Sequence, residues 1–335
     1  MQIIVSRAFV KGLAAAASRA GSGSRCGGRR AAIGSGAEGI DGHDEHDGGW
    51  RRERVEPLAV GLVLAAAVMH AVWNTFIKIG GDRLLTIAAV MAASGALGIG
   101  LAFVGPSPAP ESWPYIVLSV AIHTAYFLLL IAAYRVGDLS HAYPIARGVA
   151  PLLVAAGAWV FAGETLGPGG LAAVAVISAG ILSLAFAGGG GPDRDWRHLG
   201  YPLATGAMIA AYTVADGLGV RLSGAPASYI GWLFMFSGLP ITVIALYQRG
   251  AAVPAFLHRD WKPVLIASAL SFTAYGLAIW ALTLGAMAHV SALRETSVVI
   301  AALIGTRLLG EPFGRRRVWS AVAVAGGVVA LNVLP

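Results

Sequence analysis

From Leu58 onward, long apolar runs alternate with short connections rich in glycine, proline and charged residues. Each run is about 20 residues long, the length that a helix needs to cross about 30 Å of hydrocarbon. The connections carry turn signals such as Gly80–Asp82 and Pro106–Pro108. The pattern predicts ten membrane-spanning helices, at Leu58–Ile79, Leu84–Val104, Tyr115–Tyr134, His141–Phe161, Pro168–Phe186, Leu199–Val220, Ser228–Tyr247, Pro263–Leu284, His289–Leu309 and Val318–Leu334.

The composition agrees with a lipid environment. The chain has 335 residues, of which 57% are hydrophobic and 12% are charged, whereas soluble domains carry about 25% charged residues. The 45 glycines suit membrane helices, because small residues let helices approach closely. We therefore predict an all-α fold, a polytopic membrane protein.

The net charge of +7 does not indicate a nucleic-acid partner, because the basic residues are scattered through connections and form no patch interleaved with aromatic residues. The single cysteine, Cys26, excludes a disulfide framework and a cysteine-based metal site. No ATP-binding Walker motif occurs. We expect no cofactor, no metal and no nucleic acid.

Residues 1–57 form a separate N-terminal leader, rich in glycine, arginine, alanine and serine and without an apolar period. We interpret it as disordered. A transit peptide, or a gene start misplaced upstream of Val55, remains an alternative. The polar run His43–Asp47 lacks the fixed ligand geometry of a metal site.

The two halves of the apolar region resemble each other in an ordered series of matches. The matches pair Thr124–Tyr126 with Thr273–Tyr275, Arg147 with Arg294, and Glu164 with Glu311. Arginine and glutamate are 17 residues apart in both halves. An odd number of spans per copy inserts the copies in opposite orientations, as in many secondary transporters. We predict two inverted five-helix repeats, 58–188 and 189–335, and interpret both glutamates as structural.

Three motifs resemble the EamA-type branch of the drug/metabolite transporter superfamily. They are His70–Asn74 with Lys78, the Gly-Glu pairs that end the fourth and ninth spans, and Tyr212–Gly217 in the sixth span. The resemblance covers residues 58–335. It implies a secondary transporter for a small metabolite in the cytoplasmic (inner) membrane, and it does not identify the substrate.

Ionisable groups inside the spans are candidate transport residues, because each costs about 2.5–3.5 kcal/mol to insert. His70, Asn74 and Lys78 share one helix face and, with Trp73, could line a cavity. Alternatively, His70 bonds a neighbouring carbonyl. For Lys78 we favour an interfacial position.

Arg147, one turn after Tyr143, and its counterpart Arg294 are candidates for binding an anionic group such as a carboxylate or phosphate. In the alternative interpretation the arginines form internal ion pairs, Arg294 with Glu295 or Asp216, that pin helices together.

Asp216 and His123 are candidates for proton coupling, since a buried carboxylate or imidazole can carry a proton. The alternatives are a solvated Asp216 beside Arg221 and a satisfied interior histidine. Tyr126 and Tyr275 are related by the repeat and could flank the substrate.

We therefore expect a secondary transporter, not an enzyme, that works by alternating access, with membrane lipid and a small-molecule substrate as partners, as a monomer or a homodimer. Proton coupling through Asp216 or His123 is one hypothesis for what drives it, and the coupling ion stays open. The alternatives are an intramembrane enzyme for a lipid-linked substrate, for which no metalloprotease or nucleophile-elbow motif is present, and a non-transporting structural protein. Orientation stays open: basic connections put both termini outside, whereas the resemblance puts them inside.

Overall fold

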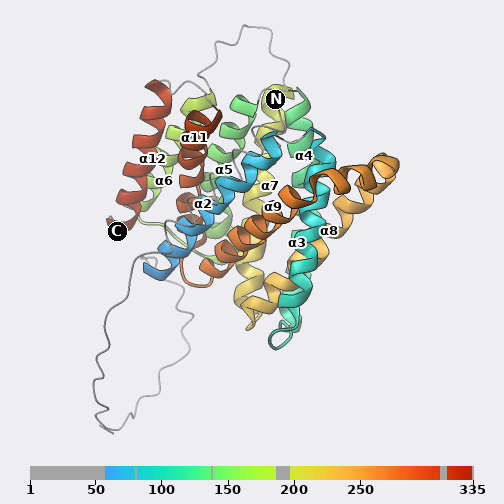
Figure 1. Cartoon of the computed structure of the whole chain (residues 1–335). Helices are drawn as coiled ribbons and strands as arrows, with labels where there is room; N and C mark the ends of the chain where they lie inside the picture. The colour runs from blue at the N-terminus through green and yellow to red at the C-terminus, as the bar shows by residue number, and fades with distance from the viewer. Residues whose placement is uncertain (1–56, 80, 137–138, 186–196, 310–314, 334–335) are drawn as a thin grey trace, which may run out of the picture. The chain divides into compact units, whose positions relative to one another are not determined.

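The computed structural model describes residues 57–79, 81–136, 139–185, 197–309 and 315–333, all within one compact unit, Trp50–Pro335. Within these ranges the secondary structure is helical, without strands. The elements are α2 (Pro57–Ile79), α3 (Arg83–Ala102), η1 (Pro110–Ser112), α4 (Trp113–Val136), α5 (Leu139–Ala162), α6 (Pro168–Ala185), α7 (Arg197–Leu222), α8 (Pro226–Arg249), η2 (Gly250–Ala252), α9 (Val253–Ala281), α10 (Met287–Arg294), α11 (Thr296–Leu309) and α12 (Arg315–Val333) (Figure 1).

The predicted all-α, polytopic class is confirmed. Seven stretches are long and apolar enough to cross a membrane, and one of them, Pro226–Ala281, contains both α8 and α9. The apolar part of α12, Arg317–Val333, is shorter. The predictions for the leader, including His43–Asp47, and for Glu311 lie outside the described residues.

Helices differ from the predicted spans at two places. α9 begins at Val253 rather than Pro263, because a proline in its first turn starts the helix early and Pro263 is accommodated inside it. The predicted ninth span, His289–Leu309, is interrupted at Glu295, where α10 ends and α11 begins. That interruption places Arg294 and Glu295 at a helix break.

The helices pack in a pattern that joins the two halves of the chain. α3 packs along α8, and α6 packs along α12. α4 contacts α7, while α2 contacts α9 and α11. In Figure 1, α6 and α12 lie at one end of the bundle, and α3 and α8 lie at the other. The main cluster of buried apolar residues contains residues of both halves, among them Val154, Ile177, Tyr229 and Leu293.

Glycines bring α3 and α8 into close contact. A Cβ atom on Gly231 would lie 2.2 Å from the backbone nitrogen of Ala102, and one on Gly98 would lie 2.7 Å from the carbonyl oxygen of Gly231. On Gly238 it would lie 2.6 Å from the carbonyl oxygen of Met91. These are backbone atoms, which cannot rotate away, so the pairing of α3 with α8 depends on glycine.

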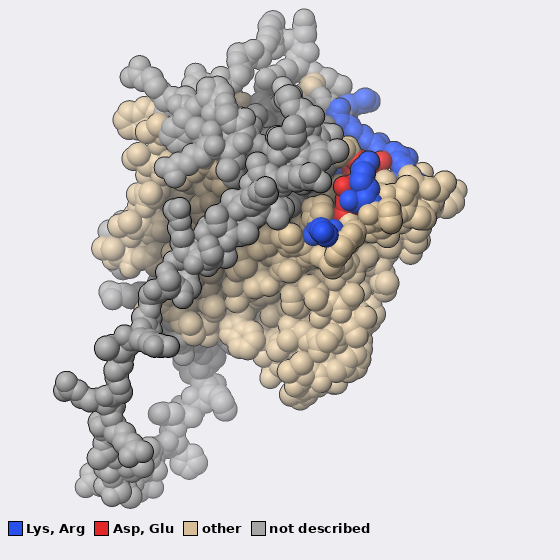
Figure 2. Space-filling view, viewed as in Figure 1, with Lys and Arg blue, Asp and Glu red and all other residues tan. Residues whose placement is uncertain are grey.

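The outer surface is apolar, as expected for contact with lipid. Large side chains such as Trp159, Phe161 and Trp319 are 64%, 71% and 68% exposed. On the face in Figure 2 the described charged side chains gather at one edge and the rest is uncharged. An apolar surface of this extent marks a membrane or protein contact rather than exposure to water.

Asp82 joins the start of α3 to the end of α8. Its carboxylate accepts hydrogen bonds from the backbone of Leu84 (3.0 Å) and Leu85 (3.2 Å), and pairs with Arg249 Nε at 3.0 Å. Partial burial raises the pKa of Asp82, but the hydrogen bonds from Leu85 and Arg249 outweigh it and hold the pKa below its usual value.

Substitution of Gly231 by alanine should destabilise the protein. The new methyl group would meet the backbone of Ala102, and overpacking of this kind costs about 1–3 kcal/mol. Gly100→Ala on α3 is the control, because nothing lies within 4 Å of its Cβ position. Thermal unfolding in detergent should show a lower midpoint for Gly231→Ala alone. Equal midpoints for the two variants would contradict the close contact.

Candidate functional site

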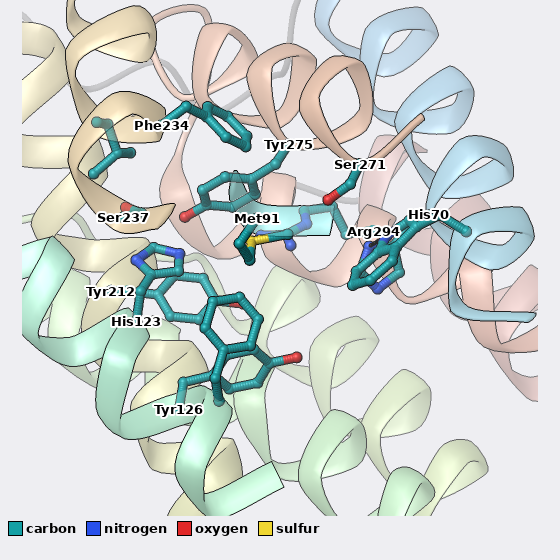
Figure 3. A pocket seen from close by; sticks show the side chains of 13 residues that line it. His70, Met91, His123, Tyr126, Tyr212, Phe234, Ser237, Ser271, Tyr275 and Arg294 are labelled. Atoms are coloured by element: carbon teal, nitrogen blue, oxygen red, sulfur yellow. Dashed lines mark hydrogen bonds between the residues drawn. The ribbon is translucent and has the colours of Figure 1, made fainter. Parts of the chain in front are cut away.

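A small cavity lies where helices of both halves meet. α2, α3, α4, α7, α8, α9 and α10 each contribute side chains to its wall (Figure 3). The sequence-predicted residues that line it are His70, Trp73, His123, Tyr126, Tyr275 and Arg294. The structure therefore brings candidates from α2, α4, α9 and α10 to one site.

Four aromatic rings form one side of the cavity. His123 stacks on Tyr212, with ring centroids 4.1 Å apart and an interplanar angle of 19°. Tyr126 and Tyr275 each meet Tyr212 edge-on, with centroids 5.6 Å apart. Edge-to-face and offset arrangements are favourable for aromatic pairs, so this cluster is a well-packed wall.

Tyr212 was not predicted as a site residue. The signal was its position one turn before Asp216, on the same face of the sixth span. Met91, Phe127 and Phe234 also line the cavity. They were missed because nothing in an apolar span distinguishes a cavity-lining phenylalanine or methionine from a packed one.

Arg294 supplies a positive charge to the cavity. It ends α10, its side chain lines the cavity, and its guanidinium carbon lies 5.2 Å from the centroid of the Tyr275 ring. Within the described ranges, no carboxylate lies within 4.0 Å of its guanidinium nitrogens. It is 8% exposed, so a buried cation faces the cavity without an ion-pair partner in the described part of the chain.

Arg147 lies next to Arg294 but does not line the cavity. Its Nε pairs with Glu295 Oε2 at 3.0 Å. Its Nη2 donates to Ser297 Oγ at 2.9 Å and to the carbonyl oxygen of Arg294 at 3.4 Å. The two arginines therefore meet at the helix break, as their repeat positions suggested, yet only Arg294 reaches the cavity lining. Glu295, expected as a partner of Arg294, pairs with Arg147.

Asp216 is fully buried behind the aromatic wall. It accepts hydrogen bonds from the hydroxyl of Tyr229 at 3.3 Å and from the hydroxyl of Tyr275. The alternative that Asp216 is solvated is wrong, because α7 continues for six residues beyond it and turns the carboxylate towards α8 and α9. Tyr275 connects Asp216 to Arg294, since its hydroxyl binds the carboxylate and its ring lies under the guanidinium.

Of the residues predicted to share one face of α2, His70 and Trp73 line the cavity and Asn74 does not. Trp73 Nε1 donates to His70 Nδ1 at 3.1 Å, and both side chains line the cavity. The side-chain amide of Asn74 instead donates to the carbonyl oxygen of His70 at 2.8 Å, within the helix. Tyr143 packs against the hydrophobic core and not against the cavity. The side chain of Lys78 lies outside the described part of the structure.

Glu164 and Arg221 together connect the segments at the ends of four helices, α5, α7, α9 and α10. It follows Gly163, whose φ of +66° ends α5. One carboxylate oxygen accepts from the backbone nitrogen of Met287 at 2.7 Å, and the other pairs with Arg221 of α7 at 2.5 Å. Arg221 also donates to the carbonyl oxygens of Leu282 and Gly285, each at 2.8 Å. These contacts join the segments at the ends of α5, α7, α9 and α10.

The cavity is smaller than a metabolite. It encloses about 50 Å³, enough for a few waters, whereas small-ligand pockets occupy about 300–1,000 Å³. A molecule of metabolite size would fit only if the helices or side chains around the cavity moved apart. Among the described residues, no group of three histidine, cysteine, aspartate or glutamate side chains could hold a metal ion.

Comparison with known proteins points to one family. Residues 198–333 match the EamA-like transporter family. A solved structure titled "Crystal structure of protein" is similar in fold, with a TM-score of 0.65, and the match covers 83% of this chain and 99% of that chain. At 18% identity this likeness concerns the fold alone. No curated protein matches the sequence.

Removal of Arg147 should destabilise the protein far more than removal of an exposed arginine. Arg147→Gln leaves Glu295 buried without its partner, which costs about 3–5 kcal/mol. The double variant Arg147→Gln with Glu295→Gln should recover much of that loss, because the carboxylate that Arg147 neutralises is then absent as well. Arg135→Gln, at the exposed end of α4, is the control. Thermal unfolding of purified variants measures each effect, and a double variant as unstable as the sum of the single variants would contradict the pairing.

Proposed function

We propose, on the premise that residues 198–333 are an EamA-like transporter domain, that this multi-pass membrane protein is a secondary transporter for a small organic anion. It would work by alternating access in the cytoplasmic membrane. The observation that carries the proposal is the unpaired, buried charge of Arg294 in a cavity between the two halves.

The packing pattern supports ten spans arranged as two inverted five-helix repeats, 58–188 and 189–335. Exchange of the halves matches α2–α6 with α7–α12, if α10 and α11 count as one interrupted span. The α3–α8 and α6–α12 contacts then map onto themselves, and the α4–α7 contact maps onto α9–α2. A pattern that survives this exchange is expected for a two-fold axis, and five spans per half would place that axis in the membrane plane.

The chemistry of the cavity favours an anion. A guanidinium in a site of low dielectric binds carboxylate or phosphate with two parallel charge-assisted hydrogen bonds. The aromatic wall of Tyr126, Tyr212 and Tyr275 offers ring faces and edges to the carbon skeleton of the substrate. A cationic substrate would instead meet the like charge of Arg294 at close range.

Arg147 would act as a positioning residue rather than a direct ligand. By holding the Arg294 carbonyl, Ser297 and Glu295, it keeps the break between α10 and α11 in place. Interrupted helices at a central site are a recurring feature of secondary transporters. Asn74 and Tyr143 would support His70 and Arg147 from behind in the same way.

Asp216 would carry the coupling proton. Its carboxylate is fully buried and accepts a hydrogen bond from the hydroxyl of Tyr275, whose ring lies beneath Arg294. A change in the charge of Asp216 would therefore alter the hydrogen bond of the side chain that contacts Arg294. His123 is held with Nδ1 2.9 Å from the carbonyl oxygen of Ser119, which favours a proton on Nδ1 and leaves Nε2 as an acceptor. Protonation of Asp216 would remove a negative charge near the site and so favour a bound anion.

Alternating access requires the cavity to open at each end in turn. At one end, the Glu164–Arg221 pair and the contacts of Arg221 with Leu282 and Gly285 would have to separate. These contacts join α5, α7, α9 and α10, the helices that carry Arg147, Asp216, Tyr275 and Arg294. Opening would therefore be linked mechanically to the site.

Transport should depend on Arg294. Proteoliposomes containing the protein would be tested for uptake of radiolabelled monocarboxylates, dicarboxylates and phosphomonoesters, each beside its neutral amide or alcohol analogue. At least one anion should be transported, and Arg294→Gln should reduce its uptake at least tenfold because the bidentate contact is lost. Arg135→Gln should transport normally. Uptake of neutral or cationic compounds alone, or unchanged anion uptake by Arg294→Gln, would refute the anion site.

Coupling should depend on Asp216. With the wild-type protein, an inward proton gradient should change anion uptake, and a pH-sensitive dye in the vesicles should report proton movement with the substrate. Asp216→Asn fixes the neutral form, so its uptake should not respond to the gradient. Tyr275→Phe keeps the ring and removes one hydroxyl donor, and should weaken the response without abolishing anion binding. Proton movement that persists in Asp216→Asn would exclude this carboxylate as the carrier.

A further inference from the structure

A second cavity, distinct from the central one, lies between α3, α8 and the first half of α9. It encloses about 330 Å³ and shares no lining residue with the central cavity. Ala88 and Ala92 of α3, Leu246 of α8, and Phe256 and Trp261 of α9 are among the residues of its wall. Its volume lies within the range of small-ligand pockets.

The wall of this groove is apolar. Thr242 is the sole lining side chain with a hydroxyl, and that hydroxyl already donates to the carbonyl oxygen of Gly238 at 2.6 Å. Small alanines on α3 create the space, and larger residues on α8 and α9 enclose it. Apart from the Thr242 hydroxyl and the indole N–H of Trp261, the side chains of the wall carry no donor or acceptor to orient a polar metabolite, so the groove fits a hydrocarbon chain.

Charged residues border the groove where α8 joins α9 and α3 begins. The cations are Arg83, Arg249, Arg259 and Lys262, and the anions are Asp82 and Asp260. Arg249 pairs with Asp82 at 3.0 Å and Arg259 pairs with Asp260 at 2.7 Å. On the face in Figure 2, the described basic and acidic side chains in view lie together at one edge. Among these described residues the cations outnumber the anions, so their formal charges sum to a positive value.

Lys262 and Trp261 have the features of an interfacial anchor. The Lys262 ammonium lies 5.4 Å from the centroid of the Trp261 ring, and Trp261 is 52% exposed. No carboxylate within the described ranges lies within 4.0 Å of the ammonium nitrogen. Tryptophan and lysine gather at the level of lipid headgroups, which places the rim at the membrane surface and the groove in the hydrocarbon below it.

We propose that this groove binds one acyl chain of an anionic phospholipid, whose phosphate lies against Arg259 and Lys262. Charge complementarity selects this occupant, since basic pockets between membrane helices bind anionic headgroups. A second copy of the chain would bring its own positive rim against this one, and like charges oppose that contact. A zwitterionic lipid would fill the groove with the same chain but carry its own cation to the rim.

A bound lipid would stabilise the packing of α9 against α3 and α8. These three helices also line the central cavity, through Met91, Phe234 and Tyr275 among others. The lipid site does not rest on the proposed transport function, because it follows from the groove and its rim alone.

Delipidated protein in detergent tests the proposal by thermal unfolding and native mass spectrometry. Phosphatidylglycerol and phosphatidylcholine with identical acyl chains would be added in parallel. Phosphatidylglycerol should raise the unfolding midpoint by several degrees and remain bound in the mass spectrum with one lipid per protein. Phosphatidylcholine should shift the midpoint less and bind at least threefold more weakly.

Two variants separate the groove from the rim. Ala92→Phe, at an exposed position in the groove wall, should fill the space and abolish retention of either lipid. The double variant Arg259→Gln with Lys262→Gln should remove the preference for phosphatidylglycerol while leaving chain binding. Ala96→Phe, exposed on α3 outside the groove, and Arg135→Gln are the matched controls and should behave as wild type.

Three results would overturn the proposal. Equal stabilisation by the two lipids would mean that lipid contacts the surface without selection. Unchanged phosphatidylglycerol retention in Ala92→Phe would place the lipid elsewhere. A dimer that forms without lipid and is disrupted by Ala92→Phe, but not by Ala96→Phe, would assign the groove to a second copy of the chain.

Discussion

The ion pair between Arg147 and Glu295 is the contact on which the centre of this protein depends. It joins α5 of the first half to the break between α10 and α11 in the second half. Both side chains are almost wholly buried, at 4% and 2% exposure, and the guanidinium also holds a backbone carbonyl at the break. Because Glu295 forms its ion pair with Arg147, the charge of the neighbouring Arg294 is not neutralised by Glu295 and faces the cavity.

This arrangement is asymmetric although the sequence positions are symmetric. Arg147 and Arg294 occupy equivalent places in the two halves, but a glutamate follows Arg294 and a glycine follows Arg147. Two unpaired guanidinium groups at one buried point would repel each other strongly in a low dielectric. The Glu295 carboxylate relieves that repulsion by pairing with Arg147, and Arg294 lies beside the aromatic wall without a carboxylate within 4.0 Å among the described residues. Neutralisation of the charge of Arg294 by a bound anion is a physical reason for the site to bind one.

The sequence predicts the helices well and the contacts between them poorly. Long apolar runs locate most of the long helices, because insertion into lipid imposes the same requirement on each. They do not show that the ninth predicted span is divided into α10 and α11. The pairing of Arg147 with Glu295 could not be predicted, since it depends on how two distant helices approach. The break at Glu295 could not be predicted either, because residues 287–309 contain no proline, and no glycine before Gly305, that would indicate a helix end. The break lies at the same tertiary contact. A solvated Asp216 was an alternative because the predicted span ends at Val220, four residues after it, whereas α7 continues to Leu222.

The residues of the candidate site also fall into two groups, those that the sequence could indicate and those that it could not. His70, Trp73, Tyr126 and Arg294 were predictable because polar and aromatic groups stand out in apolar spans, and repeat positions marked Tyr275 and Arg294. Tyr212, Met91 and Phe234 were not, because packing and lining residues look alike in sequence. The sequence does not indicate the apolar lipid groove. The alanines on α3 form its wall only because the fold places them in the same groove as Phe256 and Trp261 of α9.

Arg294 lines the central cavity and Arg147 does not, and we propose that this cavity opens to water during transport. Cysteine accessibility tests it most directly, in a Cys26→Ser background with Arg294→Cys or Ser297→Cys, where Ser297 is a fully buried partner of Arg147. A small, charged, membrane-impermeant thiol reagent should modify the first variant in membrane vesicles and leave the second unmodified. Protection of the first and modification of the second would contradict the account.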